Sequence, residues 1–219
     1  ACNARVVINL GGHVSNSTMA NAKVHRVSDT EIEGSFSSIK RYWGGPKDVK
    51  VFFVIRFDKP FQSLDGWKGK QQTVNAADFS GDSLILSAAY AMKKGEQLQM
   101  KIGLSYTTIE NARNNLQTEC AGWSFDEVKN NAQKIWNEWL GRMSVKGGTT
   151  DQKIKFYTDL WHVLLGRQKI NDVNGDYPDR TEGKREGTFT DAVFKIRTVP
   201  KDAQGRPRPG AGELLVQPW

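Results

Sequence analysis

The hydrophobic pattern of the sequence changes period near Thr107. Before this residue, apolar and polar side chains alternate, most clearly over 98–107, and a period of two is typical of a half-buried strand. After it, apolar residues recur at steps of three and four, as on one face of a helix. A strand-rich first half followed by helices predicts an α+β chain, with an antiparallel β-sandwich, complete or partial, before the helices.

Six segments of the first half carry strand signals, namely 5–10, 23–28, 31–38, 51–57, 84–90 and 98–107. Segment 51–57 is apolar on both parities, which predicts a central strand covered on both faces. Turn signals separate the segments, among them Gly44-Gly45-Pro46 and Asp65-Gly66. A weaker strand is predicted over 189–199.

Three capping boxes predict helix starts, and they pair Thr107 with Glu110, Ser124 with Glu127 and Thr149 with Gln152. The first helix is expected to run through Leu116. The second has an apolar stripe over 128–143, and the third ends near Gly166. Because Trp136, Trp139 and Trp161 lie on these stripes, we expect them to pack in a core.

No compact metal motif is present. His13, His25 and His162 are far apart in sequence. Asp172, Asn174 and Asp176 have the spacing that begins a calcium loop, but Tyr177 and Gly183 occupy the positions of its glycine and its glutamate. An Asx-stabilised tight turn is therefore the prediction for this segment.

The remaining candidates are weak. Trp43 and Trp67 lie on predicted loops and are the only candidate platforms for sugar stacking. Cys2 and Cys120 lack a CxxC partner, and their pairing is undetermined. Asn16-Ser17-Thr18 is a glycosylation sequon of low specificity. Spacing identifies no catalytic carboxylate pair among the 24 Asp and Glu residues, so no catalytic or substrate-binding residue is assigned.

The net charge of +7 raises the question of an anionic partner. Segment 180–208 holds eight basic and four acidic residues, and such a mixture favours a solvated surface over a nucleic-acid site. No apolar run approaches the roughly 18 residues that a membrane-spanning helix needs. Residues 1–10 have no basic region followed by an apolar run, so no signal peptide is predicted there.

Five ordered motifs resemble the junction region of family 92 glycoside hydrolases in residue types, order and spacing. They are SYTTIENARNNL at 105–116, GWSFD at 122–126, WNEWLGR at 136–142, FYTDLWHVLL at 156–165 and DVNGDY at 172–177. The resemblance implies that the chain is an internal fragment, with the end of an N-terminal sandwich domain at 1–107. Residues 108–168 are expected to form a helical linker and the start of the helical catalytic domain, an (α/α)6 barrel. A loop-rich start of the catalytic domain is expected at 169–208, followed by an irregular tail at 209–219.

The same resemblance implies a secreted bacterial exo-α-mannosidase, periplasmic or extracellular, that uses calcium and inverts the anomeric configuration of mannose-containing glycans. The family's general acid, general base and calcium ligands lie in an (α/α)6 barrel beyond this chain, so no catalytic residue or metal ligand is expected here. The chain alone is expected to be inactive, with apolar stripes exposed on the helices between Ser124 and Arg167. The alternative is a non-catalytic carbohydrate-binding sandwich that uses Trp43 and Trp67.

Overall fold

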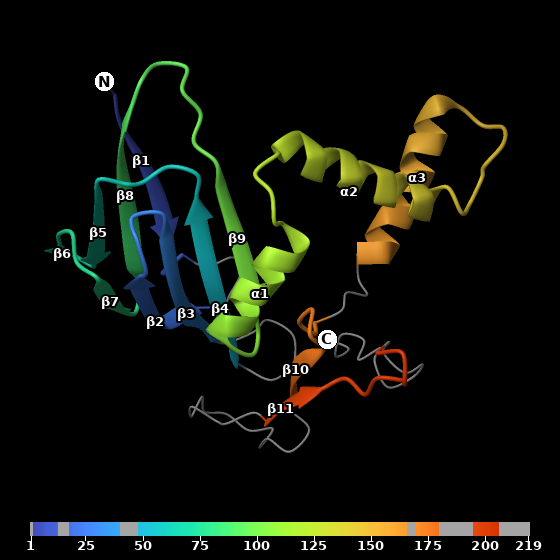
Figure 1. Cartoon of the computed structure of the whole chain (residues 1–219). Helices are drawn as coiled ribbons and strands as arrows, with labels where there is room; N and C mark the ends of the chain where they lie inside the picture. Colours follow the sequence, from blue (N-terminus) through green and yellow to red (C-terminus); the bar gives the residue numbers. More distant parts are fainter. Residues whose placement is uncertain (1, 13–17, 40–47, 166–169, 180–194, 206–219) are drawn as a thin grey trace.

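The computed structural model describes residues 2–12, 18–39, 48–165, 170–179 and 195–205 (Figure 1). Two antiparallel sheets lead into three helices and a short hairpin. The four-stranded sheet has the order β1 (Cys2–Asn9), β8 (Leu84–Met92), β5 (Ser63–Lys68) and β6 (Gln71–Thr73). The five-stranded sheet has the order β7 (Asp78–Gly81), β2 (Thr18–Arg26), β3 (Glu31–Ile39), β4 (Asp48–Phe57) and β9 (Met100–Ser105).

The main core lies between the two sheets and contains Ile32, Leu64 and Leu86, all without exposed surface. The predicted antiparallel sandwich is thus confirmed, and each of the six predicted strands is present. Three further strands, β5, β6 and β7, were not predicted. The predicted turn at Asp65-Gly66 is wrong, because both residues lie inside β5. Gly66 faces Phe79, whose ring atom would lie 2.3 Å from any added Cβ, so the absent side chain permits close packing.

Strand β4 is covered on both faces, as its apolar residues at both odd and even positions predict. Phe53 and Ile55 enter the core between the sheets. Val54 points the other way and packs against Ala112 and Leu116 of helix α1 (Ile109–Glu119). Helix α1 is therefore held against the outer face of the five-stranded sheet by a second, smaller apolar cluster.

Strand β9 has the predicted period of two, but the buried side is the opposite one. Gly103 and Ser105 are buried under α1, whereas Met100, Ile102 and Leu104 are 45%, 47% and 56% exposed. The reason is steric, because α1 approaches so closely that a Cβ on Gly103 would lie 2.2 Å from the carbonyl oxygen of Ala112. Small and polar residues therefore form the covered face of this strand.

Two of the three predicted helix starts are confirmed. Ser124 accepts a hydrogen bond from the Glu127 backbone at 3.2 Å, at the start of α2 (Phe125–Leu140). Thr149 and Gln152 exchange both bonds of a capping box before α3 (Thr150–Leu165). The first start is wrong by one residue.

The N-cap of α1 is Thr108, not Thr107. The side chain of Thr108 accepts from the Asn111 backbone, and its extended φ of −146° is typical of a cap. The capping-box pattern with Glu110 favours Thr107, but Thr107 is buried and its hydroxyl bonds to Asp172.

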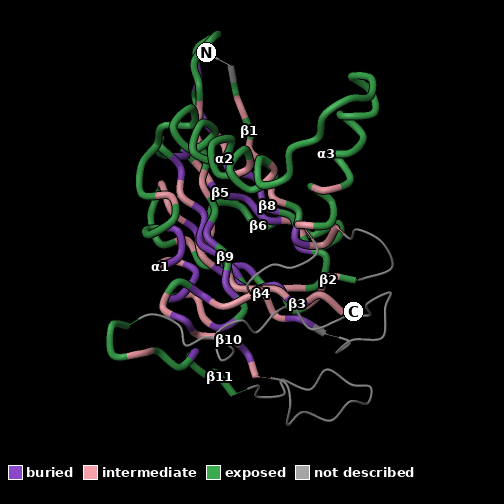
Figure 2. Tube along the Cα trace, turned by 90° about the vertical axis from the view of Figure 1, so that its right-hand side faces the viewer, coloured by how far each residue is buried: buried purple, intermediate pink, exposed green. Residues whose placement is uncertain are grey.

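Helices α2 and α3 project from the sandwich beyond α1 and contain no buried residue (Figures 1 and 2). The expected apolar stripes are exposed. The rings of Trp136 and Trp161 lie 6.2 Å apart in an edge contact, but Trp139 and Trp161 remain 46% and 37% exposed. The expectation that these tryptophans are buried is therefore wrong for the chain as it stands: α2 and α3 contact each other, and neither contains a buried residue.

A hairpin of β10 (Asp176–Asp179) and β11 (Lys195–Thr198) follows. Strand β10 falls in a segment predicted as loop. Strand β11 lies within the predicted strand 189–199, of which 189–194 lie outside the described residues. The predicted tail 209–219 also lies outside them. In the described part of the chain, no helix is long and apolar enough to cross a membrane.

Candidate functional site at the strand–helix junction

Seven polar residues join the end of β9, helix α1 and the loop before β10. We call them the junction network; they are Ser105, Thr107, Asn111, Asn115, Asp172, Asn174 and Asp176. These residues come from two regions more than 50 positions apart in sequence. The network therefore fixes where the chain goes as it leaves the sandwich and returns from the helices.

Asp172 is the buried centre of the junction network and is 3% exposed. One carboxylate oxygen accepts hydrogen bonds from the hydroxyls of Ser105 at 2.9 Å and Thr107 at 2.5 Å. The other accepts from the side-chain amide of Asn115 at 2.7 Å. Both oxygens are thus satisfied by donors from β9, its following turn and α1, as a buried carboxylate requires.

Asp176 forms the second carboxylate centre. Its oxygens accept from Asn111 at 3.0 Å, Asn174 at 2.8 Å and Thr198 at 2.6 Å. Burial raises the pKa of the Asp176 carboxyl, but the hydrogen bonds from Thr198, Asn111 and Asn174, with the nearby charge of Lys201, outweigh it and lower the pKa overall. The carboxylate is thereby kept in its charged, accepting form.

The predicted Asx turn is confirmed. The side chain of Asn174 accepts from the Asp176 backbone at 3.0 Å, and the Gly175 backbone donates to the carbonyl of Asp172 at 2.8 Å. Gly175 has a φ of +95°, which favours glycine at this position. The turn presents both aspartates toward α1.

The junction network does not fit a calcium ion. Calcium sites present six to eight oxygen ligands, whereas amide N–H donors from Asn111, Asn115 and Asn174 point at the two carboxylates. In the part of the chain that the structure describes, no group of three or more His, Cys, Asp or Glu residues could hold a metal. The hydrogen bonds of the junction network anchor the turn before β10 to α1.

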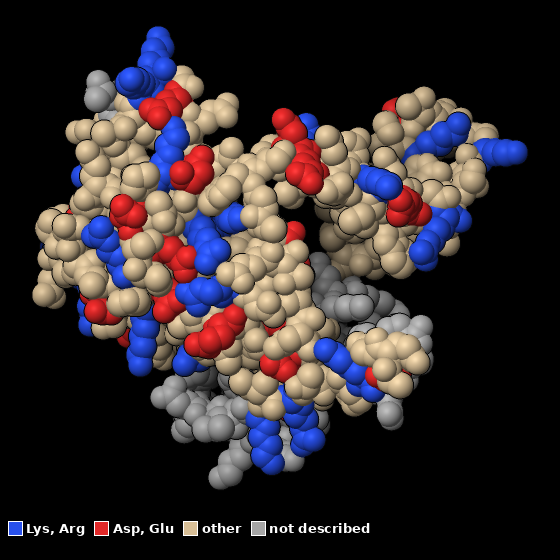
Figure 3. Space-filling view, viewed as in Figure 1, with Lys and Arg blue, Asp and Glu red and all other residues tan. Residues whose placement is uncertain are grey.

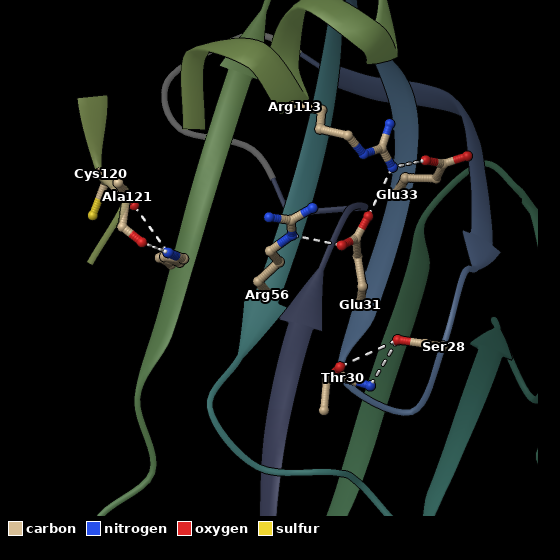
Figure 4. A network of polar contacts seen from close by, with 9 residues as sticks. Ser28, Thr30, Glu31, Glu33, Arg56, Arg113, Cys120 and Ala121 are labelled. Atoms are coloured by element: carbon tan, nitrogen blue, oxygen red, sulfur yellow. Dashed lines mark hydrogen bonds and ion pairs between the residues drawn. The ribbon is translucent and has the colours of Figure 1, made fainter. Parts of the chain in front are cut away.

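A cluster of ion pairs attaches α1 to the five-stranded sheet (Figure 4). Arg113 of α1 pairs with Glu31 at 2.7 Å and with Glu33 at 2.5 Å, and Arg56 of β4 also pairs with Glu31 at 2.5 Å. Burial raises the pKa of the Glu31 carboxyl, but the hydrogen bonds from Arg113 and Arg56 outweigh it, so its pKa lies below the usual range. The charges hold one face of the helix in register with β3.

Lys101 of β9 binds the C-terminal end of α1. Its ammonium donates to the carbonyl oxygens of Cys120 at 2.9 Å and Ala121 at 2.8 Å, two residues that Figure 4 labels. The ammonium also lies 4.4 Å from the Trp123 ring centroid. A cation at a helix C-terminus satisfies free carbonyl groups and opposes the helix dipole. Cys120, the C-cap of α1, is a free thiol.

A shallow groove of about 420 Å³ lies on the outer face of the five-stranded sheet beside Ile109. His25 and Asp78 line it with their side chains 2.8 Å apart, and both are largely exposed. On the face in Figure 3, basic and acidic side chains are interspersed, without a continuous basic patch. The groove has no aromatic platform other than the buried Phe79.

The remaining sequence candidates lie apart. His13, Trp43, Asn16 and Ser17 are outside the described residues, as is most of the basic segment 180–208. His162 makes a tilted ring contact with Trp161, with centroids 4.9 Å apart and planes at 47°, far along the chain from His25. Trp67 lies in strand β5 and is half-buried, so the predicted loop on which its candidacy as a stacking platform rested is wrong.

The sequence reasoning missed the polar side of β9 and the ion cluster. A signal for the first was present, because Gly103, Ser105 and Thr107 share one parity and are followed by Asn111 and Asn115 four residues apart on one helical face. The pairing of Glu31 with Arg113 joins residues 82 apart and had no local signal.

The structure resembles solved α-mannosidases. It matches the family GH92 alpha-mannosidase BT3965 from Bacteroides thetaiotaomicron with a TM-score of 0.76 and 20% identity, over 90% of this chain and 25% of that one. A mannoimidazole complex of the same protein gives a TM-score of 0.75 and 20% identity, over 90% and 24% of the two chains. The family GH92 inverting mannosidase BT2199 from the same organism gives 0.67 and 19%, over 83% and 24%. These likenesses establish the fold, and the chain spans about a quarter of the length of these structures.

Two family models match the sequence. Residues 1–105 match the N-terminal domain of glycosyl hydrolase family 92, and residues 111–194 match the catalytic domain of the same family. No curated protein matched the chain. Because the two models occur in order and meet at the junction network, the chain belongs to glycosyl hydrolase family 92.

Proposed function

We propose that the chain is the sandwich-to-helix segment of a longer exo-α-mannosidase, which removes terminal α-linked mannose from glycans. The observation that supports this most is the adjacency of the two family 92 models at residues 105 and 111. A structural relative bound to mannoimidazole supports a mannose-shaped substrate. The proposal includes calcium dependence, inversion and a periplasmic or extracellular location, each by resemblance to the family.

Within such an enzyme, the described residues position the catalytic domain. Inverting glycosidases need a carboxylic acid and a carboxylate about 6.5–9.5 Å apart on opposite sides of the glycosidic bond. Asp172, Asp176 and Glu31 are each saturated by hydrogen bonds or ion pairs within the protein. None of these three is therefore free to protonate a leaving group or activate water, and the general acid and base are proposed to lie outside this chain.

The junction network carries out this positioning. It ties the 170–176 turn to α1 and to the end of β9, so the chain enters the second domain at a fixed point on the sandwich. Positioning of this kind governs rate, because a displacement of about 1 Å at the reacting groups costs on the order of 100-fold in turnover.

The carbohydrate-binding alternative receives no support from the described residues. Trp67 lies within a strand and is half-buried, and the groove beside α1 lacks an exposed aromatic ring against which a sugar could stack.

The proposal is tested on the longer polypeptide encoded by the same reading frame. Incubation with an aryl α-mannoside, followed by proton NMR of the first product, is expected to show β-mannose, and a calcium chelator is expected to abolish release. Products of the α configuration would refute inversion, and undiminished turnover after chelation would refute the calcium requirement. Absence of any mannose release would refute the proposed activity itself.

A further inference from the structure

Three consecutive carbonyl groups converge on the ammonium of Lys101. They belong to Cys120, Ala121 and Gly122, and their oxygens accept hydrogen bonds at 2.9, 2.8 and 3.3 Å. The ring of Trp123 lies against the same ammonium, with its centroid 4.4 Å away. A lysine ammonium has three N–H donors, so the three carbonyl groups use its full hydrogen-bonding capacity, and the ring adds a cation–π contact. We call the three carbonyl groups and the ring the carbonyl cage.

The carbonyl cage occupies the connection between α1 and α2. Helix α1 ends at Glu119, and Ser124 is already the N-cap of α2. Residues 121–124 are exposed and belong to neither apolar cluster, so burial does not hold this connection in place. Figure 4 shows the carbonyl oxygens of Cys120 and Ala121 turned toward β9. Because the bound ammonium comes from β9, the cage ties the connection to the five-stranded sheet.

Packing does not determine the direction of α2. Neither α2 nor α3 contains a buried residue, and both project from the sandwich (Figure 1). The chain is anchored where it leaves the sandwich by the carbonyl cage, and where it returns by the junction network. The direction of α2 therefore depends on the backbone of the connection.

The length of α2 amplifies any change at the connection. The helix has 16 residues. At about 1.5 Å per residue it is about 24 Å long, so a rotation of about 10° at its start moves its far end by about 4 Å. A contact that fixes the backbone at 120–123 thus controls the position of everything that follows.

We propose that Lys101 is a positioning residue, which fixes the direction of α2 and of the catalytic domain that follows it. Lys101 acts through the carbonyl cage and touches no substrate itself. A neutral side chain would leave the carbonyl groups to water, which permits the backbone rotations that the ammonium prevents. The effect on the catalytic domain rests on the proposed function, whereas the effect on the direction of α2 does not.

The distance between two spin labels measures the direction of α2 in the 219-residue chain. One label is attached at Val27→Cys on the sandwich and the other at Gln133→Cys on α2, where both positions are exposed. Cys2→Ala and Cys120→Ala remove the native thiols, and the cage is kept because the Cys120 carbonyl belongs to the backbone. Labelled chains are diluted with unlabelled chains, so that pulsed electron paramagnetic resonance records distances within one molecule.

Lys101→Met keeps the aliphatic part of the side chain and removes the ammonium. We expect the distance distribution to become at least about twofold wider, because the released connection takes on the motions of a loop. The matched control is Lys94→Met, at an exposed lysine before β9, and it is expected to keep the narrow distribution of the parent chain. Ile32→Val, in the core between the sheets, is expected to lower stability without widening the distribution.

Three results would overturn the proposal. The first is a distribution in Lys101→Met as narrow as in Lys94→Met, and the second is a wide distribution in the parent chain. The third is equal widening in Ile32→Val, since general destabilisation would then be the cause. If circular dichroism shows that Lys101→Met does not fold, Trp123→Leu replaces it, because this change removes the exposed ring of the cage. We expect widening there too, and an unchanged width would overturn the proposal.

Turnover by the longer polypeptide tests the effect on the catalytic domain. Lys101→Met is expected to lower kcat for an aryl α-mannoside about 10-fold relative to Lys94→Met, because displaced reacting groups lose rate. Equal kcat in the two variants would overturn the positioning of the catalytic domain by Lys101. Absence of turnover in the parent polypeptide would instead refute the proposed activity, and the label distances alone would then decide the role of Lys101.

Discussion

The side-chain amide of Asn115 donates to the carboxylate of Asp172 at 2.7 Å, across 57 positions of sequence. The other end of the Asn115 amide accepts from the backbone of Val173 at 2.9 Å. One asparagine on α1 therefore holds both a buried carboxylate and the backbone beside it. This double contact makes the turn at Asp172 part of the sandwich–helix unit.

Replacing Asp172 by Ala is expected to destabilise the chain by about 2–4 kcal/mol, because three buried donors, those of Ser105, Thr107 and Asn115, lose their acceptor. Urea denaturation monitored by tryptophan fluorescence measures the change. The control is Asp159→Ala, which removes an exposed pair with Lys155 and is expected to cost less than about 0.5 kcal/mol. Equal losses in the two variants would contradict the role given to the junction network.

Gly103→Ala is expected to destabilise the chain by about 1–3 kcal/mol, since the new Cβ would lie 2.2 Å from the Ala112 carbonyl oxygen and α1 would have to move. The matched control is Gly122→Ala, where the nearest atom is 4.0 Å away. Thermal unfolding of both variants measures the difference. A Gly103→Ala protein as stable as the control would show that α1 does not pack this closely on β9.

Glu31 is expected to make stability fall in acid. Its pKa in the folded protein lies below the ordinary value of a glutamate, 4.5, so its contribution to stability is complete above about that pH and is lost as pH falls through the folded pKa. Glu31→Gln should therefore cost about 1–2 kcal/mol at pH 7 and progressively less below pH 4. Urea titrations at several pH values compare it with Glu138→Gln, an exposed change on α2. A stability gap that is independent of pH would refute the ion cluster.

The exposed stripe on α2 is expected to make the 219-residue chain self-associate. Val128 and Ile135 are 48% and 54% exposed and lie two turns apart on one helical face. Val128→Lys/Ile135→Lys is expected to lower the apparent mass at high concentration in light scattering, whereas Val27→Lys on the sandwich should leave it unchanged. A monomeric parent chain at all concentrations would contradict the expectation.

The local patterns predicted elements well where core burial or a contact between near neighbours in sequence determines the structure. The alternation in 31–38 and the double-sided run 51–57 gave β3 and β4, because both strands bury apolar residues in the core that they form with their neighbours. The boxes at Ser124 and Thr149 gave α2 and α3, since a cap is a contact between residues three positions apart.

Long-range contacts decided the features that the sequence could not provide. The local pattern favoured Thr107 as the cap of α1, but the distant Asp172 binds the Thr107 hydroxyl, and Thr108 caps the helix. The buried side of β9 depends on α1 and on the extent of the opposite sheet, neither of which is encoded in the strand itself. Asp65-Gly66 is typical of a turn, but Gly66 lies in β5, where the ring of Phe79 occupies the space that a side chain would take.

Mannose release is the most direct test of the account. The purified 219-residue chain and the longer polypeptide are assayed side by side with an α-mannoside and calcium. The account predicts release by the longer polypeptide and none by the chain, because the described carboxylates at the junction are engaged in structural contacts. Calcium-dependent release of mannose by the 219-residue chain alone would contradict it.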